Sequence, residues 1–181
     1  MSTDAANLEE VVIVDEHDHE LGTMEKLAAH RDGGRLHRAF SVFLFDDRGR
    51  LLLQQRAASK YHFGGLWANT CCSHPRRGES PVEAGARRLV EELGIGAVEL
   101  SVATTFTYRA HDEASGLTEH EFDHVLVGRF GGEPKPNPDE VQAVRWVDTE
   151  ELDRELAERP EVFSPWFPIA LRALRSAQRS R

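Results

Sequence analysis

The sequence has only two cysteines among its 181 residues, and they are adjacent, at Cys71 and Cys72. Neighbouring cysteines cannot form a disulfide between distant parts of the chain, and such sparse use of cysteine is typical of a protein in a reducing compartment. The chain also lacks an apolar run long enough to cross a bilayer, and its N-terminal residues lack the basic and then apolar layout of a secretion signal. We therefore expect a cytoplasmic protein that does not bind membranes.

Positive charge is scarce. The chain has 22 Lys and Arg residues against 31 Asp and Glu residues, which gives a formal net charge of −9. This balance argues against general binding of nucleic acid, which requires a cationic surface. It does not exclude a small anionic substrate, because such a ligand needs only a local basic pocket, with or without a divalent ion. The chain also has nine histidines, which is a high count for its length.

No internal repeat, low-complexity tract or shift in composition marks a second domain. The length suits one domain with a full core, and the hydrophobic fraction of 40% is typical of a globular protein. We expect residues 9–181 to form a single domain and residues 1–8 to be a mobile tail. Because no apolar surface stripe is left over, we expect a monomer.

Short strand-like runs alternate with turn signals and with two or three helical stretches, which predicts an α/β sandwich with a mixed sheet. The strands are expected at residues 11–14, 39–45, 51–55, 104–109, 122–130 and 141–147. A polar turn at residues 15–18 predicts a return of the chain through Leu21. Residues 46–49 predict a hairpin between the second and third strands. The residues of one expected strand, 39–45, alternate between two sets, and this predicts that both of its faces are covered. The two sets are Phe40, Val42 and Leu44, and Ser41, Phe43 and Phe45.

The clearest helix is predicted at residues 81–93. Ser80 is a good N-cap, Pro81 suits the first helical position, Glu83 completes a capping box, and Gly94 is a natural terminator. An apolar stripe is expected from Val82, Ala86, Leu89, Val90 and Leu93. Arg88 and Glu92 lie on one flank of this stripe, and Arg87 and Glu91 lie on the other. Ser164 and Pro165 predict a second capped start, of a C-terminal helix that runs through Leu171 and Leu174.

The segment from Glu79 to Ile95 resembles the Nudix box, a loop–helix–loop whose glutamates bind a divalent cation on a diphosphate substrate. Fixed carboxylates one turn apart suit a hard cation. Two positions depart from the pattern of the hydrolases: Ser73 replaces a glycine, and Arg88 replaces a glutamate. The substitution at Arg88 removes a metal ligand and adds a phosphate contact, so the box is poor for hydrolysis but usable for binding a diphosphate. A charged solvent-exposed face is the alternative for a bare pair of glutamates.

Further segments are similar to the type 1 isopentenyl-diphosphate isomerases of the Nudix superfamily, in the family's order and near its spacing. They are residues 29–30, 35–41, 69–75, 115–121 and 163–166. The resemblance covers the chain from about residue 11 to the C-terminal helix. It implies a Nudix-type α/β/α sandwich and the conversion of isopentenyl diphosphate to dimethylallyl diphosphate by a metal-dependent 1,3-allylic rearrangement, a step of isoprenoid biosynthesis.

By this resemblance, one tightly held divalent metal is bound by His30, His37, His74, Glu119 and Glu121. The residues agree with that reading. Glu119 and Glu121 are two positions apart, so both point to one side of an extended strand. A mixed nitrogen and oxygen set suits Mn²⁺, Zn²⁺ or Mg²⁺ and needs no thiolate. The remaining histidines are read as ordinary surface or hydrogen-bonded residues: His17, His19, His62, His111, His120 and His124.

The resemblance makes Cys72 and Glu121 the acid and base that add and remove a proton on opposite faces of a five-carbon unit, with Tyr108 relaying the proton. Which of the two is the acid stays open, since the reaction is reversible. A thiol can serve in either role if its surroundings bring its pKa nearer neutrality. Cys71 is expected to be a small buried packing residue.

Adding a proton to the alkene gives a carbocation-like state. This state needs surroundings that exclude water and are rich in electrons. Trp166 matches the family's aromatic residue that faces the cationic centre, although a plain core tryptophan is the alternative. Trp67 is a second candidate for a side chain that forms a wall of the active site. The phosphate contacts of the family match Arg56, Lys60, Arg88 and Lys26, and exposed solubilising charge is an equally good account of Lys26. Substrate-borne Mg²⁺ is expected at Glu92 and the backbone carbonyl of Cys72.

Two other functions share parts of this pattern. A Nudix pyrophosphohydrolase shares the fold and Mg²⁺, but it needs a fuller set of glutamates and has no use for Cys72. A binding module that has lost catalysis is disfavoured, because Cys72, Glu121 and Tyr108 are all present. The sequence therefore predicts an isomerase.

Overall fold

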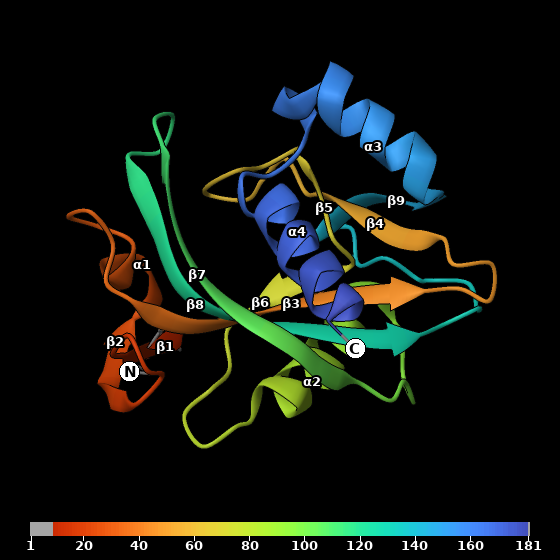
Figure 1. The fold of residues 1–181 in the computed structure, drawn as a ribbon. Helices are drawn as coiled ribbons and strands as arrows, with labels where there is room; N and C mark the ends of the chain where they lie inside the picture. Colours follow the sequence, from red (N-terminus) through yellow and green to blue (C-terminus); the bar gives the residue numbers. More distant parts are fainter. Residues whose placement is uncertain (1–8, 181) are drawn as a thin grey trace, which may run out of the picture.

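A computed structural model describes residues 9–180, so the predicted mobility of residues 1–8 lies outside the described part. A mixed nine-stranded sheet forms the centre of the molecule (Figure 1). Its strands are β1 (Glu10–Val14), β2 (Glu20–Glu25), β3 (His37–Phe45), β4 (Leu51–Arg56), β5 (Trp67–Ala68), β6 (Cys71–Ser73), β7 (Ser101–Asp112), β8 (Leu117–Arg129) and β9 (Val141–Val147). The helices are α1 (Lys26–Ala29), α2 (Pro81–Leu93), α3 (Thr149–Glu158) and α4 (Trp166–Arg179), with a 3₁₀ turn at Pro160–Val162.

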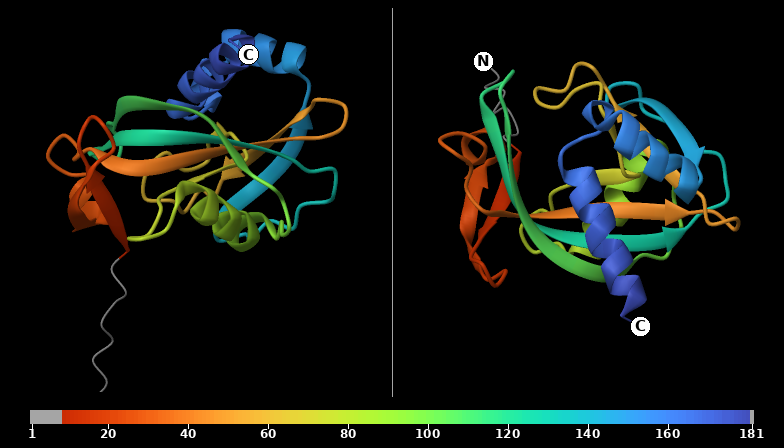
Figure 2. Two further views of the ribbon diagram at one scale, coloured as in Figure 1. Left: turned by 60° about the horizontal axis from the view of Figure 1, so that its bottom comes forward. Right: turned by 45° about the horizontal axis from the view of Figure 1, so that its top comes forward.

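The sheet separates two apolar cores, and helices α2 and α4 lie on its opposite sides (Figure 2). Phe40, Val42 and Leu44 of β3 belong to the core that contains α2. Phe43, from the same strand, belongs to the core that contains α4. The predicted α/β/α sandwich is therefore confirmed, and the alternation in β3 covers both of its faces.

Helix α2 begins and ends where the capping signals place it. The Ser80 hydroxyl accepts from the backbone N–H of Glu83, the Glu83 carboxylate accepts in return from the backbone N–H of Ser80, and Gly94 adopts the left-handed conformation. The predicted apolar stripe is partly wrong, however, because Ala86 and Val90 are exposed. A Cβ at Gly85 would lie 2.8 Å from Leu126. The bare glycine thus allows close packing on β8, and Glu92 is turned inward and is buried.

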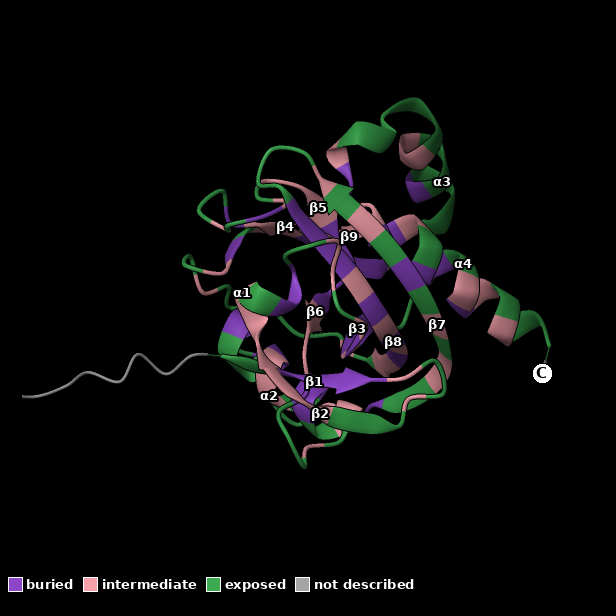
Figure 3. Cartoon of the chain, turned by 90° about the vertical axis from the view of Figure 1, so that its left-hand side faces the viewer, coloured by how far each residue is buried: buried purple, intermediate pink, exposed green. Residues whose placement is uncertain are grey.

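The predicted hairpin is only a turn. Phe45 pairs with Leu51, and this is the one register pair that joins β3 and β4 among the described residues. The two strands then separate, because β3 pairs with β8 over its whole length and β4 pairs with β9. Strand β7 pairs with β8 and is mostly exposed or half-buried along its length (Figure 3).

Helix α4 also differs from the prediction at its start. It begins at Trp166, next to Pro165, but no side chain caps it. The Ser164 hydroxyl is buried, and no hydrogen-bond partner for it lies within residues 9–180. Helices α1 and α3 were not predicted from the sequence. No helix in the described range is both long and apolar enough to span a bilayer.

Candidate active site

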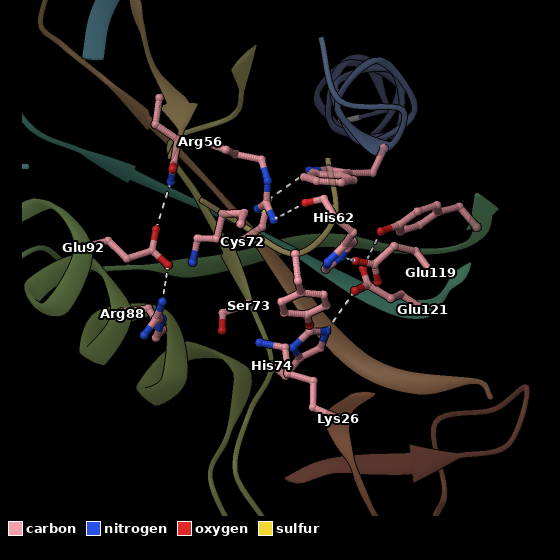
Figure 4. Close-up of a pocket in the computed structure, with 15 residues that line it drawn as sticks. Lys26, Arg56, His62, Cys72, Ser73, His74, Arg88, Glu92, Glu119 and Glu121 are labelled. Carbon is pink, nitrogen blue, oxygen red and sulfur yellow. Dashed lines mark hydrogen bonds and ion pairs between the residues drawn. The ribbon is translucent and has the colours of Figure 1, made fainter. Parts of the chain in front are cut away.

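Strand register brings the predicted site residues together. His37 of β3 lies opposite Glu121 of the parallel strand β8, and Tyr108 of β7 lies opposite Glu121 on its other side. Cys72 of β6 lies opposite Ser41 of β3. Because residues opposite one another in neighbouring strands share a face of the sheet, their side chains converge from four strands. Figure 4 shows the pocket that results.

The five predicted metal ligands form one cluster. Their ligand atoms all lie within 4.8 Å of one another, and the members are His30, His37, His74, Glu119 and Glu121. His30 and His37 are fully buried, and the two glutamates are nearly so. Glu119 and Glu121 point to one side of β8, as their spacing predicts. The arrangement is compatible with a divalent cation, since three imidazoles and two carboxylates face a common point.

Hydrogen bonds fix which nitrogen of each ring faces this point. Nδ1 of His30 lies 2.5 Å from the backbone oxygen of Lys26, and Nδ1 of His37 lies 2.7 Å from that of Arg35. A carbonyl oxygen only accepts, so both Nδ1 atoms carry the proton. Nε2 of His37 then lies 3.2 Å from Nε2 of His74. Nitrogen atoms that face each other in this way are well placed as ligands, and their backbone contacts are of the kind that orients metal-binding histidines.

The charges of the cluster are set by its own contacts. Burial opposes ionisation of Glu119, but hydrogen bonds from His30 and His62 outweigh it and hold the pKa of Glu119 well below its usual range. Burial and the charge of Glu119 act against ionisation of Glu121, yet His37 and His74 lower its pKa. Burial lowers the pKa of His74 to about 4. The cluster therefore offers ionised carboxylates and a neutral His74 at neutral pH.

Cys72 lines the same pocket. Its Sγ lies 3.0 Å from the Asn69 side-chain oxygen, to which it donates, and it accepts from the indole N–H of Trp166 at 3.1 Å. Burial is the main cause that raises the pKa of the Cys72 thiol, and Asp123 adds to the effect. The surroundings of Cys72 therefore do not bring its pKa nearer neutrality, and the resting group is a neutral thiol. Cys71 is fully buried in the α2 core, as predicted.

Tyr108 contacts Glu121 directly. Its hydroxyl donates to Oε2 of Glu121 at 2.6 Å, while Oε1 lies 2.9 Å from Nε2 of His74. Burial raises the pKa of Tyr108 well above its usual value, and the negative charge of Glu121 acts in the same direction. Both carboxylate oxygens of Glu121 are thus engaged, and Tyr108 holds a proton against one of them.

The predicted cationic residues line the same pocket: Lys26, Arg56, Lys60 and Arg88. Arg88 donates to the buried carboxylate of Glu92 at 2.5 Å, and Lys60 forms an ion pair with Glu140. Lys26 forms an ion pair with Glu9 at 2.9 Å. The guanidinium of Arg56 stacks on the Trp166 ring at 5.2 Å. Glu92 and Cys72 line this pocket as well.

The tryptophans have different surroundings. Trp166 is nearly fully buried and lines the pocket. Trp67 is not among the residues that line it; its ring instead receives the guanidinium of Arg145 at 4.8 Å. The suggestion that Trp67 forms a second wall of the site is therefore wrong, because β5 turns this ring towards β9.

Sequence reasoning missed several residues of the site. His62 was read as ordinary, but it is buried in the pocket and contacts Glu119. Gln54 donates to Glu92 at 3.0 Å, and Asp123 accepts from Ser41 at 2.8 Å behind Cys72. The position of His62 two residues after Lys60 was the one available signal. His17, His19 and His111 are exposed, as predicted.

The fold and the site define a NUDIX-domain protein. The family model of the NUDIX domain matches residues 35–167. The crystal structure of DR0079 from Deinococcus radiodurans superposes with a TM-score of 0.73 at 22% identity and covers 91% of this chain and 99% of its own. The MutT protein from Methanosarcina mazei superposes with a TM-score of 0.62 at 18% identity, over 80% of this chain and 94% of its own. At these identities the similarity shows the fold alone.

Curated relatives identify the family. The isopentenyl-diphosphate Delta-isomerase of Streptomyces griseus is 53% identical over 92% of this chain and 84% of its own length. The isopentenyl-diphosphate Delta-isomerase 1 of Aromatoleum aromaticum is 53% identical over 90% of each chain. The chain belongs to the isopentenyl-diphosphate Delta-isomerase family.

Proposed function

We propose that the protein interconverts isopentenyl diphosphate and dimethylallyl diphosphate, with Cys72 and Glu121 as the two groups that exchange protons with the five-carbon unit. The observation that carries this proposal is that the Cys72 thiol and the Glu121 carboxylate line one pocket. An acid and a base on two sides of the same slot are what the allylic rearrangement needs. The membership of the family gives the substrate.

The resting protonation states suit this role. The pKa of Cys72 is raised and the pKa of Glu121 is lowered, so one group holds a proton and the other can accept one. One proton is added to the terminal alkene carbon, which leaves positive charge on the tertiary carbon. A second proton then leaves the adjacent carbon on the opposite face. The Tyr108 hydroxyl, bonded to Glu121, connects that carboxylate to a further proton.

The aromatic ring of Trp166 supports the charged transition state. The indole of Trp166 is held in place by its hydrogen bond to Cys72 and by the stacked guanidinium of Arg56. An aromatic face stabilises a nearby desolvated cation by roughly 2 kcal/mol. The same geometry keeps the sulfur oriented, so Trp166 acts both on the thiol and on the charge that develops beside it.

The cationic side chains of the pocket suit a diphosphate. Lys26, Arg56, Lys60 and Arg88 supply the positive charge, and we assign Glu92 and the Cys72 carbonyl to substrate-borne Mg²⁺. A divalent ion at the five-residue cluster, Mn²⁺, Zn²⁺ or Mg²⁺, would supply a fixed orientation and a tuned acidity to Glu121. His30, His37, His74, Glu119 and Glu121 would hold it.

Incubation with isopentenyl diphosphate in D₂O tests the proposal. We expect deuterated dimethylallyl diphosphate, detected by NMR or mass spectrometry, with no release of phosphate. The Cys72→Ala variant is the matched control for deuterium that enters without the enzyme. Phosphate or nucleoside monophosphate released from ordinary diphosphates, with no deuterium in the alkene, would instead indicate a hydrolase.

We also propose that the enzyme works in the cytoplasm as a monomer, on a small isoprenyl diphosphate and without nucleic acid. The net charge of −9 and the sparse cysteines support this setting. Light scattering of the purified protein tests the monomer, and a mass twice that of the chain would contradict it.

A further inference from the structure

A loop of residues 57–66 joins β4 to β5 and forms one side of the pocket. Its residues Lys60, Tyr61 and His62 line the pocket. Tyr61 is 45% exposed and Gly64 is also exposed, yet His62 between them is only 5% exposed. A buried imidazole on a surface loop needs a polar partner to offset its desolvation.

The partner of His62 is a residue of the metal-ligand cluster. Nε2 of His62 contacts Oε1 of Glu119, and Nε2 of His30 lies 2.9 Å from Oε2 of the same carboxylate. Nδ1 of His62 is buried and has no hydrogen-bond partner within residues 9–180. The contact with Glu119 is therefore the polar interaction that holds this ring inside the pocket.

His62 is not one of the cluster of five whose ligand atoms lie within 4.8 Å of one another. It acts on the cluster through Glu119, by an N–H that donates to one oxygen and leaves the other oxygen turned towards His30. Outer hydrogen bonds of this kind orient a ligating carboxylate, and their loss commonly lowers metal affinity about 10–100-fold.

We propose that His62 is a positioning residue that connects loop 57–66 to Glu119, so that closure of the loop over the pocket and binding of the metal strengthen each other. This inference rests on the proposed metal-dependent isomerase function and deepens it. It assigns to the metal cluster a second role, which is to hold the loop that carries Lys60 above the diphosphate end of the pocket.

The loop borders the pocket and also faces solvent. Tyr61 lines the pocket and is 45% exposed, so the loop lies at the edge of the pocket. Since Tyr61 and His62 form part of the wall, their movement is the direct way to admit the substrate. The closed loop then brings Lys60 to the ligand.

The coupling has a physical reason. In the structure, His30 and His62 contact the two oxygens of Glu119. A bound cation would hold this carboxylate more tightly, so that the oxygen facing His62 keeps a single orientation and the loop loses less entropy on closing. By linkage, the closed loop must strengthen metal binding by the same factor.

Metal affinity and loop protection test the proposal together. The affinities for Mn²⁺ and Zn²⁺ are measured by competition with a chromogenic chelator for the wild type and for His62→Ala, His62→Gln and His111→Ala. We expect a loss of at least about tenfold for His62→Ala and a partial recovery for His62→Gln, whose amide N–H can reach Glu119. His111→Ala is the matched control, because His111 contacts Thr118 next to Glu119 but touches none of the cluster.

Hydrogen exchange of peptides that cover residues 57–66 gives the second measurement. In the wild type, added metal should slow exchange of the loop, and in His62→Ala this effect should be much smaller. Wild-type affinity in His62→Ala, or equal slowing by metal in both proteins, would overturn the proposal. Circular dichroism shows whether each variant is folded. If His62→Ala is not folded, the metal affinity and loop exchange of His62→Gln decide whether the proposal stands.

The same samples separate this inference from the proposed function. A wild type that binds metal but does not isomerise in D₂O would refute the isomerase, while the affinities of the His62 variants would still decide the coupling. An active wild type whose metal affinity does not depend on His62 would refute the coupling alone.

Discussion

The Tyr108 hydroxyl donates a hydrogen bond to Oε2 of Glu121 at 2.6 Å, in a buried part of the pocket. Their strands are paired in register, so the contact is fixed by the backbone as well as by the side chains. Tyr108→Phe removes the proton but keeps the ring. We expect it to reduce kcat by about 10–100-fold, and Glu121→Gln by about 10²–10⁴-fold, because the latter removes the proton-accepting group itself. Steady-state kinetics measure both, and a Tyr108→Phe enzyme with the kcat of the wild type would contradict the relay role.

The adjacent cysteines offer a matched pair of variants. Cys72→Ala should lower the rate of isomerisation by about 10²–10⁴-fold while the fold remains intact, since it removes one half of the proton exchange. Cys71→Ala should leave a small cavity in the α2 core and destabilise the protein by about 1 kcal/mol, with kcat close to that of the wild type. Equal loss of activity in both variants would show that packing, and not the thiol of Cys72, explains the effect.

Metal removal should change stability as well as activity. A ligand at about a thousand times its Kd stabilises the native state by about 4 kcal/mol, which for a domain of this size raises Tm by roughly 10 °C. We therefore expect a chelator to abolish turnover and lower Tm, and added Mn²⁺ or Zn²⁺ to restore both.

The matched variants for the metal experiment are His30→Ala and His120→Ala. His30 is a member of the cluster, whereas His120 lies next to Glu119 and Glu121 in the chain and its Nδ1 lies 3.2 Å from the backbone oxygen of Gly34. His30→Ala should lose the metal-dependent rise in Tm, and His120→Ala should keep it. Full activity of the wild type in the presence of chelator would argue against the metal site.

The pH dependence of stability should report His74. Burial lowers its pKa to about 4 in the folded protein, against about 6.5 when unfolded. Between these values the unfolded state binds more protons, so the free energy of unfolding rises with pH and is lost on acidification. For the metal-free protein we expect a fall on the order of 1–2 kcal/mol from pH 6.5 to pH 5, measured by urea denaturation. His74→Gln should have a flatter profile in this window, and an unchanged slope would contradict the assignment.

Local patterns of the sequence determined the parts of the site that depend on a single element. The capping box and Gly94 fix both ends of α2, because helix termini need partners for their free backbone groups and the nearest residues supply them. The spacing of Glu119 and Glu121 placed both carboxylates on one side of β8, because successive side chains in a strand alternate. The resemblance to a family added which of the histidines join these carboxylates.

Only the tertiary structure decided which strands meet and in what register. His37 faces Glu121 because β3 and β8 pair in parallel, and a strand's own sequence does not specify its neighbour. The raised pKa of Cys72, the inward turn of Glu92 and the contact of His62 with Glu119 all arise from burial among residues distant in the chain. Burial and long-range pairing are properties of the packed molecule, so no local period or capping signal could predict them.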